Sequence, residues 1–369
     1  MKILVVMPYF FPATIYGGPI FASYNLCKEV VKTDCKIKVL TTNINGNKKI
    51  ETNNLFQNID NIYVKYCKEQ ITSFFSIDLI KSLWSEMKLT DVVHIQPIYS
   101  YPTPIALLFA TIHNKKIVLS PRGSLARWSF NKKGWLKKMW IHFFIKPFSK
   151  RIFWLSTSEK EKKEILYFFK NASVQLLSDG IDFDSGFVKK KCDFSNQNYI
   201  SALARIHPVK GFDLLIEAMV KIIKVRPKLN LFIAGFDDGC LNDLKQLVVK
   251  LKLENNVRFV GELSGDIKNQ FLAHSKCLFM PSHTENFGIV AAESLAVGTP
   301  VIASKNTPWK VLEQTNAGLH IENNPEQIYK SCILLLDKLE DFEKNTQSLA
   351  KEYQWKNIAE KYLSIIGSL

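Results

Sequence analysis

Two glutamates stand eight residues apart where the sequence pattern passes from a buried strand into a helix. Apolar residues 277–280 are typical of a short buried strand, and Glu285 follows them in a loop. A helix is predicted over about 288–297, so Glu293 lies within its first turns. Carboxylates accept sugar hydroxyls, and the free amides of a helix N-terminus favour phosphate oxygens. The pair suits a nucleotide-sugar, with a hydrolytic pair of carboxylates as the alternative.

Two cations are predicted at the same edge of the same sheet. Arg205 follows a strand pattern over 199–204, and Lys210 precedes a helix pattern over 211–225. Because the carboxyl ends of parallel strands share one edge, both cations are expected near Glu285. A guanidinium and an ammonium can neutralise a diphosphate leaving group, which is the task of a metal ion in other transferases.

Strand and helix patterns alternate along both halves of the chain. Strands are expected at 3–6, 36–41, 92–95, 116–120, 199–204, 229–234, 257–260, 277–280 and 300–303. Helices intervene, the first at about 20–31 and the last at 355–366. This alternation predicts α/β domains with parallel sheets, and the polar segment 178–198 separates the two halves. Ligands of such sheets bind beyond the carboxyl ends of the strands.

Charge and cysteine use restrict the class of protein. The chain has 369 residues and a net charge of +15, and eleven Lys or Arg lie between Asp91 and Glu159 without one acidic residue. This excess implies a negatively charged partner, either phospholipid, nucleic acid or diphosphate. Seven scattered cysteines without a Cys-x-x-Cys pair favour a reducing cytoplasm. We expect neither a signal peptide nor a membrane span, since the apolar runs are too short.

Taken together, these motifs resemble the family 4 retaining glycosyltransferases of the GT-B fold. The resemblance covers nearly the whole chain, and its markers are Gly17-Gly18, residues 205–211 (Arg-Ile-His-Pro-Val-Lys-Gly), Glu285 with Glu293, and the turn Ser178–Asp182. It implies two Rossmann-like domains with parallel sheets that face each other across a cleft. Residues 1–178 with the helix 355–369 would form the acceptor and membrane side, and 179–354 would bind the nucleotide-sugar.

The resemblance also implies roles for particular residues. Those assigned to catalysis are Arg205, Lys210 and Glu285, and those assigned to the donor are Gly17, Gly18, Phe287, Gly288, Ile289 and Glu293. Glu285 would contact hydroxyls of the donor sugar and Glu293 the ribose, so neither needs to transfer a proton. The donor would be a UDP- or GDP-sugar, and the enzyme a hexosyltransferase that retains the anomeric configuration. No metal and no other cofactor is expected.

One loop departs from the family pattern. Many members carry a histidine on a first-domain loop near the reacting sugar, whereas the corresponding loop 120–123 here holds Arg122. Arg122 could bind the donor phosphate or an acidic acceptor, but it cannot act as a base. His94 ends a strand and is a second candidate for this site, although a core histidine is the more ordinary interpretation. The Asp182-Phe183-Asp184 sequence is interpreted as a turn and not as a metal site.

A basic segment rich in aromatic residues is predicted to touch a membrane. Its expected contacts are Lys132, Lys133, Trp135, Lys137, Lys138 and Trp140. A Lys-rich helix with Trp and Phe suits an anionic bilayer, whereas stacking on nucleic acid and burial against the domain are the alternatives. We expect membrane contact without nucleic acid. The chain would then lie in the cytoplasm on the inner face of the plasma membrane.

Three hypotheses for the whole protein follow. The first is transfer of a sugar to an oligosaccharide or lipid-linked saccharide acceptor during synthesis of a bacterial surface polysaccharide such as lipopolysaccharide, O-antigen or capsule. The second is another GT-B enzyme, such as a nucleotide-sugar epimerase or a phosphorylase. The third is a binding protein whose basic face holds nucleic acid.

Overall fold

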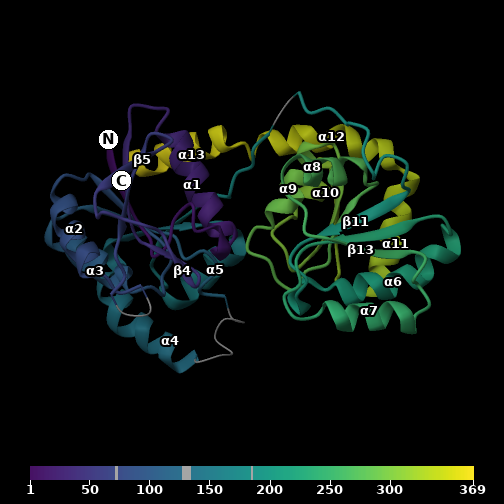
Figure 1. Cartoon of the computed structure of the whole chain (residues 1–369), viewed down its shortest axis with the longest axis horizontal. Helices are drawn as coiled ribbons and strands as arrows, with labels where there is room; N and C mark the ends of the chain where they lie inside the picture. The colour runs from purple at the N-terminus through teal and green to yellow at the C-terminus, as the bar shows by residue number, and fades with distance from the viewer. Residues whose placement is uncertain (71–73, 127–133, 184–185) are drawn as a thin grey trace. The chain divides into compact units, whose positions relative to one another are not determined.

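The chain folds as two compact α/β units. The computed structural model describes residues 1–70, 74–126, 134–183 and 186–369. Unit 1 comprises Met1–Gly180 and Trp355–Leu369, and unit 2 comprises Ile181–Gln354 (Figure 1). Each unit contains one large sheet in which nearly all neighbouring strands are parallel. The predicted fold class, two α/β domains with parallel sheets, is therefore confirmed.

The sheet of unit 1 has eight strands in the order β10-β9-β8-β7-β1-β2-β6-β5. Their bounds are β1 (Lys2–Val6), β2 (Lys36–Thr42), β5 (Phe56–Ile59), β6 (Ile62–Cys67), β7 (Val92–Ile95), β8 (Lys116–Leu119), β9 (Ile152–Ser156) and β10 (Ser173–Leu176). Only β5 runs antiparallel to its neighbour, β6. A separate short hairpin joins β3 (Ile44–Asn45) to β4 (Lys48–Lys49). Every residue of the central strand β7 is buried, as a continuous apolar run predicts.

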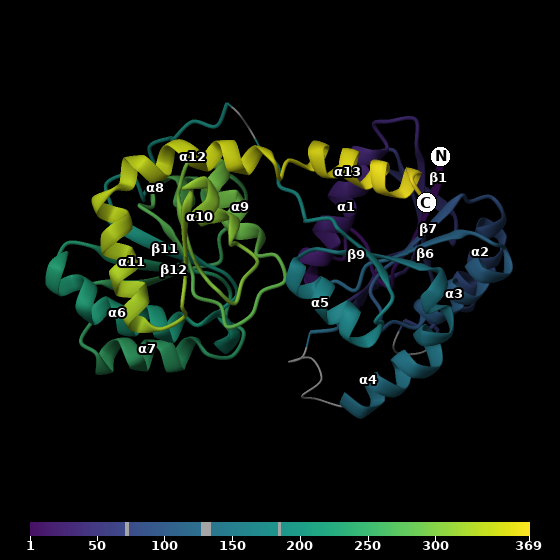
Figure 2. The ribbon, with the colours of Figure 1, turned by 180° about the vertical axis from the view of Figure 1, so that it is seen from behind.

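Helices cover both faces of this sheet. They are α1 (Gly18–Val30), α2 (Ile77–Lys88), α3 (Pro102–Ile112), α4 (Gly134–Trp140), α5 (Glu159–Phe168) and α13 (Trp355–Gly367), with one-turn or irregular helices at Thr14–Tyr16, Ile141–Ile145 and Lys146–Arg151. The apolar sides of α1 and α13 share one core cluster, and those of α2, α3 and α5 share the other. Figure 2 shows α13 lying along α1, so the last helix of the chain completes the core of the first unit.

The sheet of unit 2 is wholly parallel and reverses its strand order at the centre. Its strands are β11 (Tyr199–Leu203), β12 (Asn230–Ala234), β13 (Val257–Gly261), β14 (Leu278–Met280), β15 (Val301–Ser304) and β16 (Gly318–Ile321), in the order β13-β12-β11-β14-β15-β16. The chain adds strands outward from β11 in one direction and then starts again at β14 in the other. This point, between β11 and β14, is where open parallel sheets bind ligands.

The helices of unit 2 also divide between the two faces of the sheet. They are α6 (Phe212–Val225), α7 (Leu241–Lys250), α8 (Gly265–His274), α9 (Ile289–Ala296), α10 (Val311–Thr315), α11 (Pro325–Asp337) and α12 (Leu339–Lys351), with a single turn at Pro208–Lys210. One core cluster contains buried side chains of α6, α7 and α11, and the other contains those of α8, α9 and α12. Helices α8 and α9, which follow β13 and β14, therefore lie on the same face.

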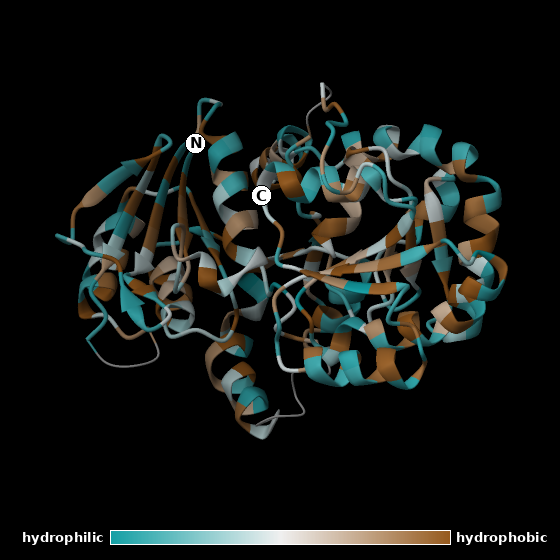
Figure 3. Cartoon of the chain, turned by 45° about the vertical axis from the view of Figure 1, so that its right-hand side comes forward, coloured by the Kyte–Doolittle hydropathy of each residue, from teal (hydrophilic) through white to brown (hydrophobic). Residues whose placement is uncertain are grey.

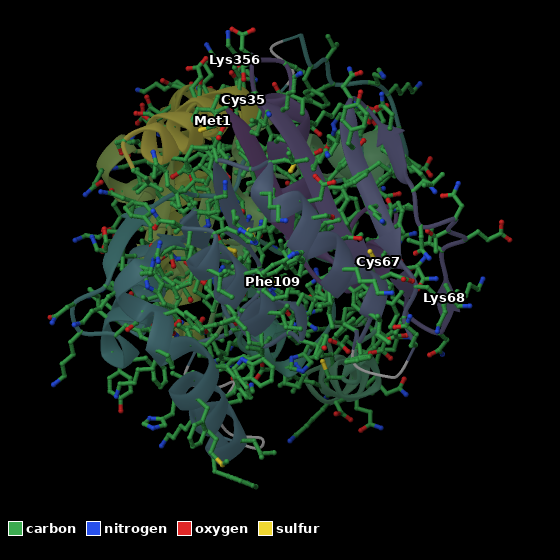
Figure 4. All side chains as sticks on the ribbon, turned by 90° about the vertical axis from the view of Figure 1, so that its left-hand side faces the viewer. Met1, Cys35, Cys67, Lys68, Phe109 and Lys356 are labelled. Atoms are coloured by element: carbon green, nitrogen blue, oxygen red, sulfur yellow. The ribbon has the colours of Figure 1, made fainter. Side chains whose placement is uncertain are left out.

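Hydrophobic side chains gather on the strands and on the inner sides of the helices. Figure 3 shows brown segments along the strands of both units, and teal recurs on the outer turns of the helices. All seven cysteines are free thiols and five of them are buried. Cys67 and Lys68 are labelled in Figure 4: Cys67, the last residue of β6, is buried, whereas Lys68, which follows the strand, is exposed. Among the described helices, none has the length and apolarity needed to cross a membrane.

Candidate functional site

Two loops meet at the point in unit 2 where the strand order reverses. The loop after β11 leads to α6, and the loop after β14 leads to α9. The His283 amide donates to the Val209 carbonyl at 2.8 Å and ties the loops together. Gly211 has a φ of +65°, and a Cβ there would lie 2.1 Å from the Pro281 carbonyl oxygen. Only glycine allows this approach, and it brings the residues just before Gly211 against those just after Pro281.

Lys210 and Glu285 form a largely buried ion pair where these loops meet. The Lys210 ammonium lies 2.5 Å from Glu285 Oε2, and the two side chains are only 14% and 17% exposed. Lys210 ends the single turn Pro208–Lys210, which His207 begins by accepting the Val209 amide on its ring at 3.1 Å. The structure thus brings two of the predicted catalytic residues together. Removing either one would leave the other charge partly buried and unpaired.

Arg205 lies on the same edge of the sheet with an acidic partner of its own. Its Nη1 donates to Asp238 Oδ2 at 2.9 Å, and about half of the arginine side chain is exposed. The partner is placed by backbone hydrogen bonds between the loops after β11 and β12, in which the Ile206 amide donates to Phe236 and the Asp238 amide to Ile206. The sequence placed Asp238 in a loop that was a candidate to border the site of the base, but it did not predict the pairing with Arg205. Its position just after a predicted buried strand was the available signal.

The helix that carries Glu293 begins as predicted, within one residue. Gly288 is its N-cap at a φ of +79°, and a Cβ there would lie 2.7 Å from Met280 Sδ and 3.0 Å from Glu285 Cγ. The next residue, Ile289, opens α9, so its amide has no acceptor within the helix. Glu293 lies one turn further on. Its Oε1 accepts a hydrogen bond from the ammonium of Lys268 on α8 at 2.7 Å.

The Phe287 side chain packs in the core of unit 2. Its side chain is 6% exposed, and its ring packs against Trp309 and Tyr353 at centroid distances of 5.3 and 5.6 Å. Its carbonyl accepts the Trp309 indole N–H at 2.6 Å. The predicted donor contact of Phe287 is made by its backbone, so the packing of the ring leaves it a prediction. The ring instead fixes the loop between Glu285 and α9.

The predicted glycine pair lies in unit 1, at the start of α1. Gly17 is the N-cap with a φ of +76°, which favours glycine for conformational reasons. Gly18 has no such φ, and a Cβ on either glycine would meet no atom within 4 Å. Neither backbone strain nor neighbouring atoms therefore require glycine at position 18.

Arg122 is held inside unit 1 by its own side-chain partners. Its side chain is 9% exposed, its Nε donates to Gln96 Oε1 at 2.9 Å, and its Nη1 forms an ion pair with Asp179. Buried Glu161 accepts the next amide, that of Gly123, at 2.5 Å; burial raises the pKa of this carboxyl. The adjoining cavity has a volume of about 10 Å³, room for one water molecule. A phosphate or an acidic acceptor would have to compete with these partners, and its contact with Arg122 stays a prediction.

His94 is a core histidine. It is 1% exposed, its Nδ1 is hydrogen bonded to the Tyr362 hydroxyl at 3.1 Å, and its Nε2 to Ser120 Oγ at 2.8 Å. Burial, and then the charge of Arg122, lowers the pKa of His94 to about 3. The ring is therefore neutral and connects β7 to α13. This burial agrees with the more ordinary interpretation of the sequence, a core histidine.

The predicted membrane residues differ in exposure. Lys132 and Lys133 lie outside the described residues, as does Asp184 of the Asp-x-Asp sequence. Trp135 is 65% exposed and Lys138 is also exposed. Two others turn partly toward the domain. Lys137 lies 5.3 Å from the Tyr99 ring centroid with a pKa lowered by burial, and the Trp140 indole donates to the Ile98 carbonyl at 3.0 Å.

Within the described ranges, no group of three or more His, Cys, Asp or Glu is arranged to hold a metal ion. The charged residues predicted for the candidate site are instead two cations, Arg205 and Lys210, and two carboxylates, Glu285 and Glu293. All four are arranged in ion pairs along the carboxyl edge of the unit 2 sheet.

The second half of the chain is similar to known glycosyltransferases. Residues 186–364 match the family described as glycosyl transferases group 1. It is 26% identical over 230 residues to a D-inositol 3-phosphate glycosyltransferase of Mycobacteroides abscessus, covering 58% of this chain and 51% of the relative. It is also 26% identical over 227 residues to the O-antigen chain mannosyltransferase RfbU of Salmonella typhimurium, covering 60% and 62%.

The chain thus spans about half to three fifths of the length of these curated relatives. Among solved structures, HepE of Anabaena in complex with UDP superposes with a TM-score of 0.77 at 17% identity, covering 100% of both chains. This likeness establishes the fold, which is the GT-B fold of glycosyltransferases, as the motifs predicted.

The buried histidine makes the stability of this chain depend on pH. Because the pKa of His94 is about 3 in the folded chain and near 6.5 when unfolded, only the unfolded chain binds this proton between those values. The free energy of unfolding should therefore decrease as the pH falls below 6.5, by up to about 1.4 kcal/mol per pH unit from this residue. Urea denaturation at pH 4 to 7 should show a shallower decrease for His94→Gln than for the unsubstituted chain. Equal slopes would contradict the assignment.

Proposed function

We propose that this chain is a retaining glycosyltransferase that moves a sugar from a UDP- or GDP-sugar to a saccharide acceptor. The observation that carries the proposal is the Lys210–Glu285 pair, which lies at the centre of the carboxyl edge within the family region. Support for the donor comes from HepE, whose solved structures hold UDP and UDP-glucose. Support for the acceptor comes from RfbU, an O-antigen chain mannosyltransferase.

In the proposed reaction, the bond between the anomeric carbon and the diphosphate oxygen breaks, and its electron pair goes to the diphosphate. Lys210 and Arg205 neutralise the charge that develops there, which stabilises the transition state more than the ground state. The acceptor hydroxyl attacks from the face that the diphosphate leaves, and its proton passes to a phosphate oxygen. The configuration is retained, and the reaction needs neither a metal ion nor another cofactor.

The carboxylates bind rather than transfer protons in this scheme. Glu285 accepts hydroxyls of the donor sugar, and Glu293 accepts those of the ribose. In the structure each carboxylate contacts an ammonium: Glu285 that of Lys210, and Glu293 that of Lys268. When sugar hydroxyls donate to Glu285 in place of Lys210, the Lys210 ammonium becomes available to the neighbouring phosphate. Donor binding thus exchanges one set of charged hydrogen bonds for another.

An exposed apolar face on residues 134–145 supports attachment to a membrane. It consists of Trp135, Leu136, Met139, Phe143 and Phe144, whose exposure ranges from 42% to 65%. On the opposite side Ile141 and Ile145 are buried and fix the helix to unit 1. Exposed Lys138, Lys146 and Lys150 flank the face. Such a face, mixing aliphatic with aromatic side chains beside lysines, suits an anionic bilayer better than stacked bases.

We therefore place the protein on the cytoplasmic face of the plasma membrane, where a lipid-linked saccharide is the acceptor. The context is synthesis of a bacterial surface polysaccharide. A lipid-linked acceptor and a membrane-bound enzyme would meet on the same surface.

The donor can be identified by its effect on the melting temperature. UDP-, GDP-, ADP- and CMP-sugars are compared, and the correct donor should raise the midpoint by mass action. Glu293→Ala should abolish that rise, since it removes the proposed ribose acceptor. Absence of a rise with every nucleotide-sugar would contradict the proposed function.

With the donor known, we expect Lys210→Met and Glu285→Gln each to lower the rate of nucleoside diphosphate release by about 10²–10³-fold, the loss typical of a group that stabilises transition-state charge. The control is Lys221→Met, which breaks an exposed ion pair with Glu326 on the outside of α6. Circular dichroism and melting temperature show whether each variant folds. Near-normal turnover in folded Lys210→Met and Glu285→Gln would contradict the site assignment.

Membrane binding has its own test, independent of catalysis. The chain should sediment with vesicles that contain about 30% anionic phospholipid, and the bound fraction should fall as the salt concentration increases. Combined Trp135→Ser, Met139→Ser and Phe143→Ser should reduce the bound fraction at least about fivefold, because apolar area drives insertion. Trp84→Ser, at a 42% exposed tryptophan on α2, is the control. Undiminished binding of the triple variant would refute this surface.

A further inference from the structure

Glu293, the proposed acceptor for ribose hydroxyls, forms an ion pair with a lysine on a neighbouring helix. Lys268 Nζ donates to Glu293 Oε1 at 2.7 Å, and the two side chains are 23% and 21% exposed. Most other ion pairs in the described chain are more exposed; in Lys221–Glu326, for example, the side chains are 57% and 43% exposed. Exposed pairs contribute little because water screens them. The Lys268–Glu293 pair is screened less, so it can fix a geometry.

Rigid elements position both partners. Helices α8 and α9 pack on the same face of the unit 2 sheet, through Phe271 and Leu272 of α8 and Ala292 and Leu295 of α9. The Thr299 hydroxyl, just beyond α9, donates to the Leu272 carbonyl at 2.8 Å and locks this contact. The lysine and the glutamate therefore project from packed helices and not from loops.

Both side chains also lie at the ligand edge of the sheet. Helix α8 begins after β13 and α9 after β14, and each helix starts near the carboxyl end of its strand. Lys268 is the fourth residue of α8 and Glu293 the fifth of α9. Each is about one turn from the end of its helix that faces this edge.

We infer that Lys268 is a positioning residue for Glu293, and that the pair makes the site prefer ribose over 2′-deoxyribose; the inference rests on the proposed function. The ammonium holds Oε1 and fixes the rotation of the carboxylate, so that Oε2 stays in place as an acceptor for a ribose hydroxyl. A glutamate without this partner would lose rotational freedom when the nucleotide binds, and affinity would fall accordingly. Because the effect depends on the hydroxyl, a 2′-deoxyribonucleotide gains little from it.

Calorimetric titration with UDP, GDP and their 2′-deoxy counterparts tests the inference. The unsubstituted chain should bind the ribonucleotide of its preferred base roughly tenfold more tightly than the deoxy form, as expected when a charged acceptor loses its hydroxyl donor. Lys268→Met should weaken ribonucleotide binding about fivefold and leave deoxyribonucleotide binding nearly unchanged. Lys268→Arg should restore most of the preference, since it keeps the charge and the donors. Lys221→Met is the matched control.

A double variant separates positioning from direct contact. If Lys268 acts through Glu293, then Lys268→Met combined with Glu293→Gln should bind no more weakly than Glu293→Gln alone. If the two losses multiply, Lys268 contacts the nucleotide itself and the inference is overturned. It is also overturned if Lys268→Met keeps the full ribose preference. Lys268→Gln replaces Lys268→Met in this test if it folds better. If the unsubstituted chain binds neither UDP nor GDP, the proposed function itself fails.

Discussion

The contact between the loops after β11 and β14 is the constraint on which the candidate site depends. Gly211 lies so close to the Pro281 carbonyl that a single added carbon would not fit. This approach is possible only at the point where the strand order reverses, because there the two following helices leave toward opposite faces. The Lys210–Glu285 pair is a consequence of that closeness. Two residues 75 positions apart become direct neighbours because their strands are neighbours.

The charged side chains at this edge are arranged in pairs. Arg205 lies beside Asp238, Lys210 beside Glu285, and Lys268 beside Glu293. Pairing limits the repulsion among three cations and holds each long side chain near one position, which lowers the entropic cost of binding. The pairs differ in exposure, and the half-exposed Arg205–Asp238 pair can separate at less cost than Lys210–Glu285. A change of partner at Arg205 would therefore leave less buried charge unpaired than a change of partner at Lys210.

Sequence reasoning succeeded where periodicity and strand order carry the information. The helix expected at 288–297 is Ile289–Ala296, and the strand expected at 92–95 is unchanged. Strand order alone placed Lys210 and Glu285 at one edge. The partner lysine of Glu293 could not be found in this way, because its pairing joins the surfaces of two helices and follows no repeating pattern. Propensity determines where α8 and α9 begin, but packing determines which of their side chains meet.

Arg122 shows why a charge must be judged by its partners in the fold. It lies in a stretch from Asp91 to Glu159 that has no acid, so its guanidinium looks available to a ligand. Asp179, beyond the end of that stretch, pairs with it. Lys138, Lys146 and Lys150 belong to the same stretch, yet in the described part of the chain no carboxylate lies within ion-pair distance of them. The basic residues of this stretch therefore differ in role. Arg122 stabilises unit 1, whereas the three lysines form a positive surface beside the apolar face of residues 134–145.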